Sequence, residues 1–547
     1  MGQAVSDTAA APALPTRRAD LLERLTHSGT WDLAVVGGGA TGLGVALDAA
    51  SRGLSVVLLE SHDFAKGTSS RATKLVHGGV RYLAQGDIGL VREALHERTT
   101  LLRNAPHLAQ PLPFVLPAYK LWEMPFYGAG LVMYDALAGV AGLGRTEFLS
   151  RGRTLQALPT ARPEGLKGGI RYWDGQFDDA RLALALARTA ALHGALVVNY
   201  CEVTGLLYAE GRVSGVAARD AETGREFRLQ ARCVVNATGV WVDALRRQDG
   251  KAGGRAVQPM VAPSQGVHVV VDRDFLPGQH ALMVPKTADG RVLFAVPWLG
   301  KLILGTTDTP RDDLPREPRP FPQELDFILG ESGRYLVRAP RAQDIRSTWV
   351  GLRPLVRPVG NGDEPTKALS REHTVLVSRS GLVTVTGGKW TTYRAMAEDV
   401  LEKCFAAHLL PRAASGVTAN LPLVGAPGQG AAATPLSAAP GPHLYGSEAA
   451  QLAALGGDPR HLGGGLTAGM VLFAGRHEYA RTVEDVLARR SRMLFLDAAL
   501  AGQLAGEVGA LLRQETGVDP QVESFRALAA SYLQPPGLQD LFDKSRQ

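Results

Sequence analysis

The stretch Leu33-Ala34-Val35-Val36-Gly37-Gly38-Gly39-Ala40-Thr41-Gly42 decides the fold, because it carries an apolar run straight into a glycine-rich turn. The apolar run predicts a buried parallel strand. The Ala- and Leu-rich residues 40–51 predict a helix, and residues 55–59 (SVVLL) predict the next buried strand. Strand, helix and strand within about 30 residues form one βαβ unit.

The turn has the spacing of a dinucleotide-binding loop. Gly37 allows the tight turn, Gly39 lets the backbone approach a pyrophosphate, and Gly42 allows the helix to pack closely on the strand. Glu60 ends the second strand, where a carboxylate accepts hydrogen bonds from the adenosine ribose. The motif alone does not separate NAD from FAD. Its position ahead of two further glycine-capped strands favours a tightly held FAD that reaches into a second domain.

The other predicted strands suggest two sheets. Residues 231–236 are followed by Ala237-Thr238-Gly239, and residues 382–386 by Gly387-Gly388, so both continue the nucleotide-binding sheet. Alternating apolar residues predict an antiparallel sheet that carries the substrate, over 266–272, 292–296 and 302–305.

Four regions are expected along the chain. They are a disordered tail with a short helix (1–30, helix 20–27), an FAD-binding domain interleaved with a substrate-binding sheet domain (31–412), a linker (413–442) and a C-terminal helical domain (443–547). Residues 425–442 are small, rich in proline and uncharged, as in linkers. Helical spacing of apolar residues predicts helices over 479–495 and 499–513. The tail has no apolar core of a signal peptide.

Residues 127–143 are the most apolar stretch of the chain. Their length, their glycines and Asp135 argue against a membrane span. A buried helix or a helix at the substrate cleft is the favoured interpretation, and an interfacial membrane contact is the alternative.

The amino-acid composition excludes several classes of protein. The 547 residues are 45% hydrophobic and 20% charged, which excludes a disordered chain. The net charge of +6 is dilute and no lysine-rich block is present, so no nucleic-acid partner is expected. An anionic substrate or an anionic membrane surface suits this charge. The three cysteines lack CxxC spacing, and no cluster has the spacing of metal ligands, so no metal is expected.

A set of motifs then resembles one family in order and content. The set comprises Thr68–Leu83 (TSSRATKLVHGGVRYL), 172–175 (YWDG), 178–182 (DDARL), 235–239 (VNATG), 305–308 (GTTD), 351–355 (GLRPL), 387–394 (GGKWTTYR), 444–447 (LYGS) and 480–487 (ARTVEDVL). Over roughly residues 31–500 the chain resembles the FAD-dependent glycerol-3-phosphate dehydrogenases of the aerobic, quinone-linked type.

The resemblance implies a fold and an activity. The fold is α/β, with an FAD-binding Rossmann-like domain as in glutathione reductase and D-amino-acid oxidase, an antiparallel-sheet substrate domain and a C-terminal helical cap. The activity is oxidation of sn-glycerol 3-phosphate to dihydroxyacetone phosphate by hydride transfer to FAD, with electrons passed to a membrane quinone. Such an enzyme is expected in the cytoplasm, peripheral on the inner face of the membrane. The resemblance leaves open whether it forms a homodimer.

The resemblance also implies roles for individual residues. His268 is the expected general base, and Arg353 the expected stabiliser of the developing alkoxide. Four residues are expected to bind the substrate phosphate: Arg81, Tyr82, Arg371 and Lys389. Residues expected around the flavin are Thr68, Ser69, Ser70, Lys74, His77, Thr238, Gly239, Gly388 and Thr391.

Three alternatives stay open at this stage. The first is a glycerol-3-phosphate oxidase that uses oxygen. The second is an amine or amino-acid oxidase of the same fold, which needs a carboxylate clamp in place of a phosphate clamp. The third is a flavin-binding interaction protein without turnover.

Overall fold

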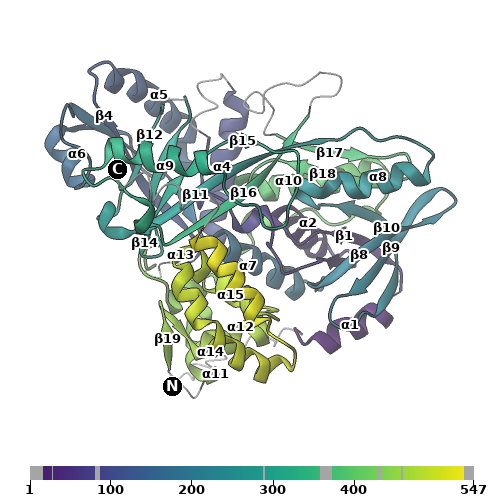
Figure 1. Cartoon of the computed structure of the whole chain (residues 1–547). Helices are drawn as coiled ribbons and strands as arrows, with labels where there is room; N and C mark the ends of the chain where they lie inside the picture. The colour runs from purple at the N-terminus through teal and green to yellow at the C-terminus, as the bar shows by residue number, and fades with distance from the viewer. Residues whose placement is uncertain are drawn as a thin grey trace, which may run out of the picture.

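Figure 1 shows a computed structural model of the chain. The structure describes residues 16–27, 29–79, 87–287, 290–357, 372–428, 430, 433–456 and 460–534. It contains two large sheets, side by side in Figure 1, and a group of C-terminal helices drawn in yellow-green.

The first sheet is the predicted nucleotide-binding sheet. Five strands are parallel in the order β18-β10-β1-β2-β7, and β17 pairs antiparallel with β18. The bounds are β1 Trp31–Val36, β2 Val56–Leu59, β7 Leu196–Val198, β10 Glu226–Asn236, β17 His373–Val377 and β18 Leu382–Gly387. Strands β8 (Cys201–Ala209) and β9 (Arg212–Asp220) extend from β10.

Helices pack against this sheet and bury its central strands. Helix α2 packs against both α7 and α10. These helices span Ala40–Ser51 (α2), Asp179–Leu192 (α7) and Tyr393–Ala406 (α10). The remaining helices outside the C-terminal group are α1 Arg18–His27, α4 Ile88–Asn104, α5 Glu123–Ala138, α6 Arg151–Ala157, α8 Val242–Ala252 and α9 Pro322–Tyr335. The predicted βαβ unit and the helix after the tail are therefore confirmed.

The second sheet is almost entirely antiparallel, as predicted. Its strand order is β15-β11-β14-β13-β12-β4-β6-β3, with β16 on β11 and β5 on β6; only β12 and β4 run parallel. The bounds are β3 Leu75–Val76, β4 Ala109–Ala118, β5 Glu147–Ser150, β6 Gly168–Phe177, β11 Val261–Asp272, β12 Ala281–Val284, β13 Leu293–Trp298, β14 Lys301–Gly305, β15 Thr309–Pro310 and β16 Ser347–Val356.

Strand β11 shows how this sheet divides the core. Val267, Val269 and Val271 belong to a cluster with α9 residues on one face. Val270 belongs to a different cluster, which includes Phe495 from the C-terminal helices. Side chains alternate between the faces of a strand, so His268 shares the face of Val270. The predicted base therefore lies on the side of the sheet that meets the C-terminal helices.

The C-terminal region is helical, but one predicted helix is wrong. Residues 479–495 do not form a single helix, because residues Asp485–Arg490 form a π-helical turn and Arg492 adopts a left-handed backbone conformation with φ of 65°. The helices are α11 Ala449–Gly456, α12 Ala468–His477, α13 Met493–Leu496, α14 Ala498–Thr516 and α15 Val522–Leu533. A short hairpin, β19 His461–Gly463 with β20 Leu466–Thr467, precedes α12.

The described part of the predicted linker is hydrogen-bonded to the second sheet. Leu436 is buried, and its carbonyl accepts a hydrogen bond from the Leu299 amide at 2.7 Å. The predicted disordered tail lies outside the described residues up to residue 15.

The favoured interpretation of residues 127–143 is confirmed in part, because the inner face of their helix is buried and Tyr134 donates to Asp174, which lines the cavity of about 570 Å³ described below. These residues lie mainly in α5, whose outward face exposes large apolar side chains, including Phe126 and Val132. Periodicity does not reveal this exposure, because apolar residues lie on both the buried and the outward faces of the helix. Among the described residues no helix has both the length and the hydropathy of a membrane span.

Candidate active site

The glycine-rich loop leaves no space for side chains at two of its three predicted positions. A Cβ at Gly42 would lie 1.9 Å from the Gly37 carbonyl oxygen, and one at Gly37 would lie 2.7 Å from the Ala237 oxygen. Gly37 also has φ of +109°, which side chains disfavour. Ala237 follows β10, so the ends of β1 and β10 meet at this loop. A Cβ at Gly39 would lie 3.0 Å from Ser69 Oγ, so this glycine brings the loop against the segment 68–79.

Polar groups surround the start of α2. Glu60 Oε2 accepts a hydrogen bond from the Gly38 amide at 2.7 Å, so its carboxylate lies at the loop. Ser69 Oγ accepts from the Ala40 amide at 2.9 Å, at the first turn of the helix. On the β10 side, Thr238 Oγ1 donates to Asn236 Oδ1 at 2.8 Å, and Gly239 has φ of +61°. The loop thus has the form that binds a dinucleotide pyrophosphate at a helix N-terminus.

A cavity of about 570 Å³ gathers most of the other predicted residues. The residues come from the segment 68–79, from β11 and β16, and from the turn before α10. The predicted residues in its lining are Thr68, His77, His268, Arg353, Gly388, Lys389 and Thr391. Another part of the lining is apolar and includes Leu75, Phe114, Tyr172, Met283 and Phe294. The cavity therefore combines a cationic part with an apolar part.

Strand register explains how His268 and Arg353 come together. On β11 and β16, His268 pairs with Trp349, Gly266 with Gly351, and Ser264 with Arg353. A Cβ at Gly266 would lie 2.3 Å from Arg353 Nη2, so the guanidinium crosses the strand over a residue without a side chain. A Cβ at Gly351 would lie 2.6 Å from the Arg71 carbonyl oxygen. The paired glycines thus make room for Arg353 and for the segment 68–79 on one face of the sheet.

His268 is buried and closely held. Its ring stacks on Trp349 with 5.0 Å between centroids and 16° between planes. Its Nε2 lies 2.9 Å from Thr73 Oγ1, and its buried Nδ1 has no hydrogen-bond partner among the described residues. Burial, helped by the positive charges of Lys74 and Arg353, holds the pKa of His268 well below its usual 6.5. The imidazole is therefore neutral near pH 7.

Arg353 is anchored at one side of its guanidinium. Its Nη2 donates to the Thr307 carbonyl at 2.9 Å, and its Nη1 pairs with Asp308 at 3.3 Å. One quarter of the side chain is exposed, so the group stays accessible from the cavity. Lys389 lies at the turn before α10, and Thr391 Oγ1 donates to the His77 carbonyl at 3.4 Å.

Lys74 does not line the cavity. Its ammonium is fully buried and donates to both Asp179 oxygens, at 2.7 and 2.9 Å, and to the Ser70 carbonyl at 2.8 Å. Burial and Arg492 lower the pKa of Lys74 to about 7, with Asp179 opposing them. Arg492 donates to Asp179 at 3.0 Å and to the Ser70 carbonyl at 2.9 Å. The lysine belongs to a buried ionic cluster behind the cavity, so the flavin contact expected for its ammonium finds no support here.

Three of the predicted phosphate-binding residues, Arg81, Tyr82 and Arg371, lie outside the described residues. The structure adds two side chains that the sequence analysis did not assign. Thr73 touches His268 and lines the cavity, and Trp349 stacks on His268. Thr73 lies inside the quoted segment 68–83, so the motif could have indicated it. Trp349 could not be identified from the sequence, because its contact with His268 depends on the register of β11 and β16.

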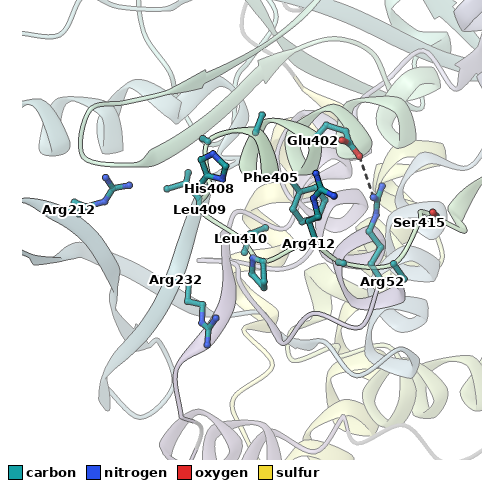
Figure 2. Close-up of a pocket in the computed structure, with 15 residues that line it drawn as sticks. Arg52, Arg212, Arg232, Glu402, Phe405, His408, Leu409, Leu410, Arg412 and Ser415 are labelled. Carbon is teal, nitrogen blue, oxygen red and sulfur yellow. Dashed lines mark ion pairs between the residues drawn. The ribbon is translucent and has the colours of Figure 1, made fainter.

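A second cavity, of about 1230 Å³, lies elsewhere (Figure 2). Its lining contains Arg52, Arg212, Arg232 and Arg412, and none of the described residues predicted for the site. Arg52 pairs with Asp48 at 2.8 Å and with Glu402 at 3.5 Å, so part of this positive charge is already balanced. We assign no chemistry to this cavity.

Comparison with known proteins defines the class first. Residues 32–394 match the family model described as FAD dependent oxidoreductase, and residues 416–523 match the one described as C-terminal domain of alpha-glycerophosphate oxidase. The fold and the loop thus define an FAD-dependent oxidoreductase.

The family follows from longer matches. The chain is 40% identical to the mitochondrial glycerol-3-phosphate dehydrogenase of Homo sapiens over 92% of this chain and 73% of that protein. It is 39% identical to the mitochondrial glycerol-3-phosphate dehydrogenase of Arabidopsis thaliana, over 93% and 86%. The solved glycerol-3-phosphate dehydrogenase from Bacillus halodurans, complexed with FAD, superimposes with a TM-score of 0.75 and 29% identity, over 95% and 99% of the two chains. The chain belongs to the FAD-dependent glycerol-3-phosphate dehydrogenase family.

The residues present fit FAD. The glycine loop excludes side chains where a pyrophosphate approaches, and the Glu60 carboxylate lies at the same loop, where it accepts from the Gly38 amide.

Proposed function

We propose that the enzyme oxidises sn-glycerol 3-phosphate to dihydroxyacetone phosphate and passes the electrons to a membrane quinone. The observation that carries the proposal is one cavity in which the neutral imidazole of His268 shares the lining with the cationic Arg353 and Lys389. FAD, when bound, supplies the two-electron acceptor for the hydrogen at C2.

His268 takes the proton of the substrate's C2 hydroxyl at Nε2. Thr73 Oγ1 lies 2.9 Å from this nitrogen at the cavity wall, and the substrate hydroxyl takes its place as the partner of the Nε2 lone pair when the proton is transferred. Stacking on Trp349 fixes the plane of the ring. A pKa below 6.5 keeps the base unprotonated at neutral pH, so it is ready before substrate arrives.

Arg353 and Lys389 have different roles in the proposed reaction. Arg353, held by Thr307 and Asp308, stabilises the oxygen at C2 as the proton leaves. Lys389 supplies a point charge for the phosphate dianion. Arg81, Tyr82 and Arg371 complete the phosphate clamp in this proposal, on the strength of the motifs alone.

The remaining predicted residues hold FAD in this proposal. Gly37, Gly39 and Gly42 admit the pyrophosphate, and Glu60 binds the ribose. Residues assigned around the flavin are Thr68, Ser69, Ser70, His77, Thr238, Gly239, Gly388 and Thr391. They lie in the segment 68–79, directly after β10 or at the turn before α10.

Oxygen is the alternative electron acceptor. The match of residues 416–523 to a domain named after an oxidase favours this second candidate. The apolar outward face of α5 favours a quinone that arrives from a lipid surface. We place the enzyme on the inner face of the cytoplasmic membrane, where its net positive charge suits anionic lipid.

Anaerobic reduction tests the activity. sn-Glycerol 3-phosphate is expected to bleach the flavin absorbance of the holoenzyme, and glycerol at the same concentration is not. Equal bleaching by both would contradict the phosphate clamp. Reoxidation by a quinone analogue that outpaces peroxide formation in air supports the quinone, and the reverse order supports the oxidase.

A further inference from the structure

We infer that Glu324, in the first turn of helix α9, is a positioning residue for the reaction. It acts through Thr307 and holds Arg353 in place for the oxygen at C2 of the substrate. The inference deepens the proposed function, on which it rests for the role of Arg353. Glu324 belongs to none of the motifs that resemble the family, and it is not among the residues that line the catalytic cavity.

Glu324 is a buried carboxylate whose two oxygens both accept hydrogen bonds. The residue is only 3% exposed. Its Oε2 accepts from the Phe321 amide at 2.9 Å, directly before α9, and from Nε2 of Gln265 on β11. Its Oε1 accepts from the hydroxyl groups of Thr307, at 2.8 Å, and of Thr309. A buried charge is costly unless hydrogen bonds compensate it, and four donors from three parts of the chain do so here.

Thr307 joins this carboxylate to the catalytic groups. Its hydroxyl has one proton, which it donates to Glu324, and the same oxygen accepts from the Val267 amide at 3.0 Å. Val267 directly precedes His268 on β11. The Thr307 carbonyl oxygen accepts from Arg353 Nη2 at 2.9 Å. The hydroxyl and the carbonyl of one residue therefore connect the buried carboxylate to the guanidinium.

The neighbours of Thr307 contact the same guanidinium. Asp308 pairs with Arg353 Nη1 at 3.3 Å and also accepts from the Ser264 hydroxyl. Thr306 Oγ1 accepts from Arg353 Nη2 at 3.4 Å. Because three consecutive residues contact the guanidinium, a shift of the turn 306–308 moves all three contacts together. The position of this turn therefore sets where Arg353 points.

The four donors explain why a carboxylate is needed at position 324. A carboxylate only accepts hydrogen bonds, whereas the amide nitrogen of a glutamine must donate two. Arg311 Nη1 donates to Gln265 Oε1 at 2.7 Å, which leaves Gln265 Nε2 as the donor that faces Glu324. A glutamine here would direct its own N–H groups at this donor or at the two hydroxyl groups, and Thr307 would have to turn. Exchange of one oxygen for nitrogen thus loosens the anchor of Arg353 while the side chain keeps its shape.

Anaerobic flavin reduction by sn-glycerol 3-phosphate, measured in single turnovers of the holoenzyme, tests the inference. Glu324→Gln is expected to reduce flavin about 10- to 30-fold more slowly than the wild type, because a small displacement of a catalytic group costs up to about 10²-fold. The KM is expected to stay within about threefold, because loss of an interaction made in the transition state lowers kcat and not binding. Flavin content reports folding. A rate equal to that of the wild type overturns the inference.

A second buried carboxylate of the same helix is the matched control. Glu331 lies two turns further along α9, is 5% exposed and pairs with Arg334 at 2.8 Å. In the part of the chain that the structure describes it makes no hydrogen bond to the turn 306–308. Glu331→Gln is therefore expected to reduce flavin at the rate of the wild type. A loss equal to that of Glu324→Gln would show a general effect of buried charge in α9 and would reject the inference.

The Thr307 hydroxyl gives a test that leaves Glu324 unchanged. Thr307→Val removes the hydroxyl and is expected to slow flavin reduction as Glu324→Gln does, whereas Thr307→Ser keeps the hydroxyl and is expected to retain most of the rate. This pair decides the matter if Glu324→Gln does not retain flavin. Equal rates for the valine and serine variants contradict the inference.

A double-mutant cycle shows whether the effect of Glu324 passes through Arg353. Arg353→Ala is expected to slow flavin reduction about 10²–10³-fold. Glu324→Gln added to Arg353→Ala is expected to slow it by less than about threefold more, because the group that it positions is gone. An equal further loss in both backgrounds overturns the inference, since Glu324 then supports the fold or the strand of His268.

The cycle also separates this inference from the proposed function. A loss in Arg353→Ala without a loss in Glu324→Gln overturns the inference alone. A rate near that of the wild type in Arg353→Ala contradicts the role given to Arg353, and the inference fails with it. Failure of the wild type to reduce its flavin with sn-glycerol 3-phosphate contradicts the proposed function itself.

Discussion

The Thr73 hydroxyl oxygen lies 2.9 Å from Nε2 of His268. Thr73 belongs to the segment 68–79 and His268 to β11, so one hydrogen bond joins the segment beside the cofactor loop to the substrate sheet. We expect Thr73→Val to lower kcat about fivefold with little change in KM, because loss of a neutral hydrogen bond costs about 1 kcal/mol. Steady-state kinetics of Thr73→Val and Thr73→Ser check this. Recovery in the serine variant is expected, and equal loss in both would point to packing instead of the hydroxyl.

Removal of the base is expected to have a larger effect. His268→Ala should lower kcat by about 10²–10⁴-fold and leave substrate binding nearly unchanged. The exposed His193 at the end of α7 offers a control, since His193→Ala should keep full activity. Anaerobic single-turnover reduction of the flavin isolates the step. A loss of less than tenfold would reject the base assignment.

The pH dependence follows from the same histidine. A base is active when unprotonated, and the pKa of His268 lies below 6.5 because of burial and the neighbouring cations. The acid limb of kcat/KM should therefore fall below pH 6.5, with activity retained from there up to neutrality. A profile over mildly acidic buffers measures it, with unfolding followed in parallel. A limb centred above pH 7 would be inconsistent with this environment.

Cofactor retention tests the loop. Gly42→Ala should abolish stable FAD binding, because the new Cβ would lie 1.9 Å from the Gly37 carbonyl oxygen. Gly330→Ala, in α9 with no atom within 4 Å of the added Cβ, is the control and should be neutral or more stable by up to about 1 kcal/mol. The ratio of flavin to protein absorbance after gel filtration decides the matter. Full flavin content in Gly42→Ala would show that the loop is not the binding element.

The buried ionic cluster should be essential for stability. Arg492→Met leaves the buried carboxylates of Asp178 and Asp179 short of positive charge, and should lower the free energy of unfolding by roughly 3–5 kcal/mol. Arg513→Met removes an exposed pair with Asp519 and should cost less than about 1 kcal/mol. Urea unfolding followed by circular dichroism compares them. Equal midpoints for the two variants would remove Arg492 from the set of residues that stabilise the fold.

Local patterns predicted the parts of the structure that local interactions decide. The run from Leu33 to Gly42 predicted strand, turn and helix, because burial and glycine geometry act within a few residues. The position of His268 on a strand was also predictable. Trp349 was not, because its contact with His268 depends on the register of β11 and β16, which the alternation of side chains alone does not set.

Two further features lay beyond the reach of sequence patterns. Lys74 stands within the quoted flavin motif, yet its ammonium pairs with Asp179 and shares that carboxylate with Arg492. Pairing between such distant residues leaves no periodic signal. The exposure of α5 was hidden for another reason, since an apolar helix has the same sequence pattern whether protein or lipid covers it.

Arg492 also has a consequence for how the molecule is made. The loop at Gly37 and Lys74 are synthesised early, but the carbonyl of Ser70 and the carboxylate of Asp179 receive their second cationic partner only after residue 492 has been synthesised. A nascent chain that stops short of this arginine holds every glycine of the loop, but only one of the two cations, Lys74, that pair with Asp179 in the buried cluster.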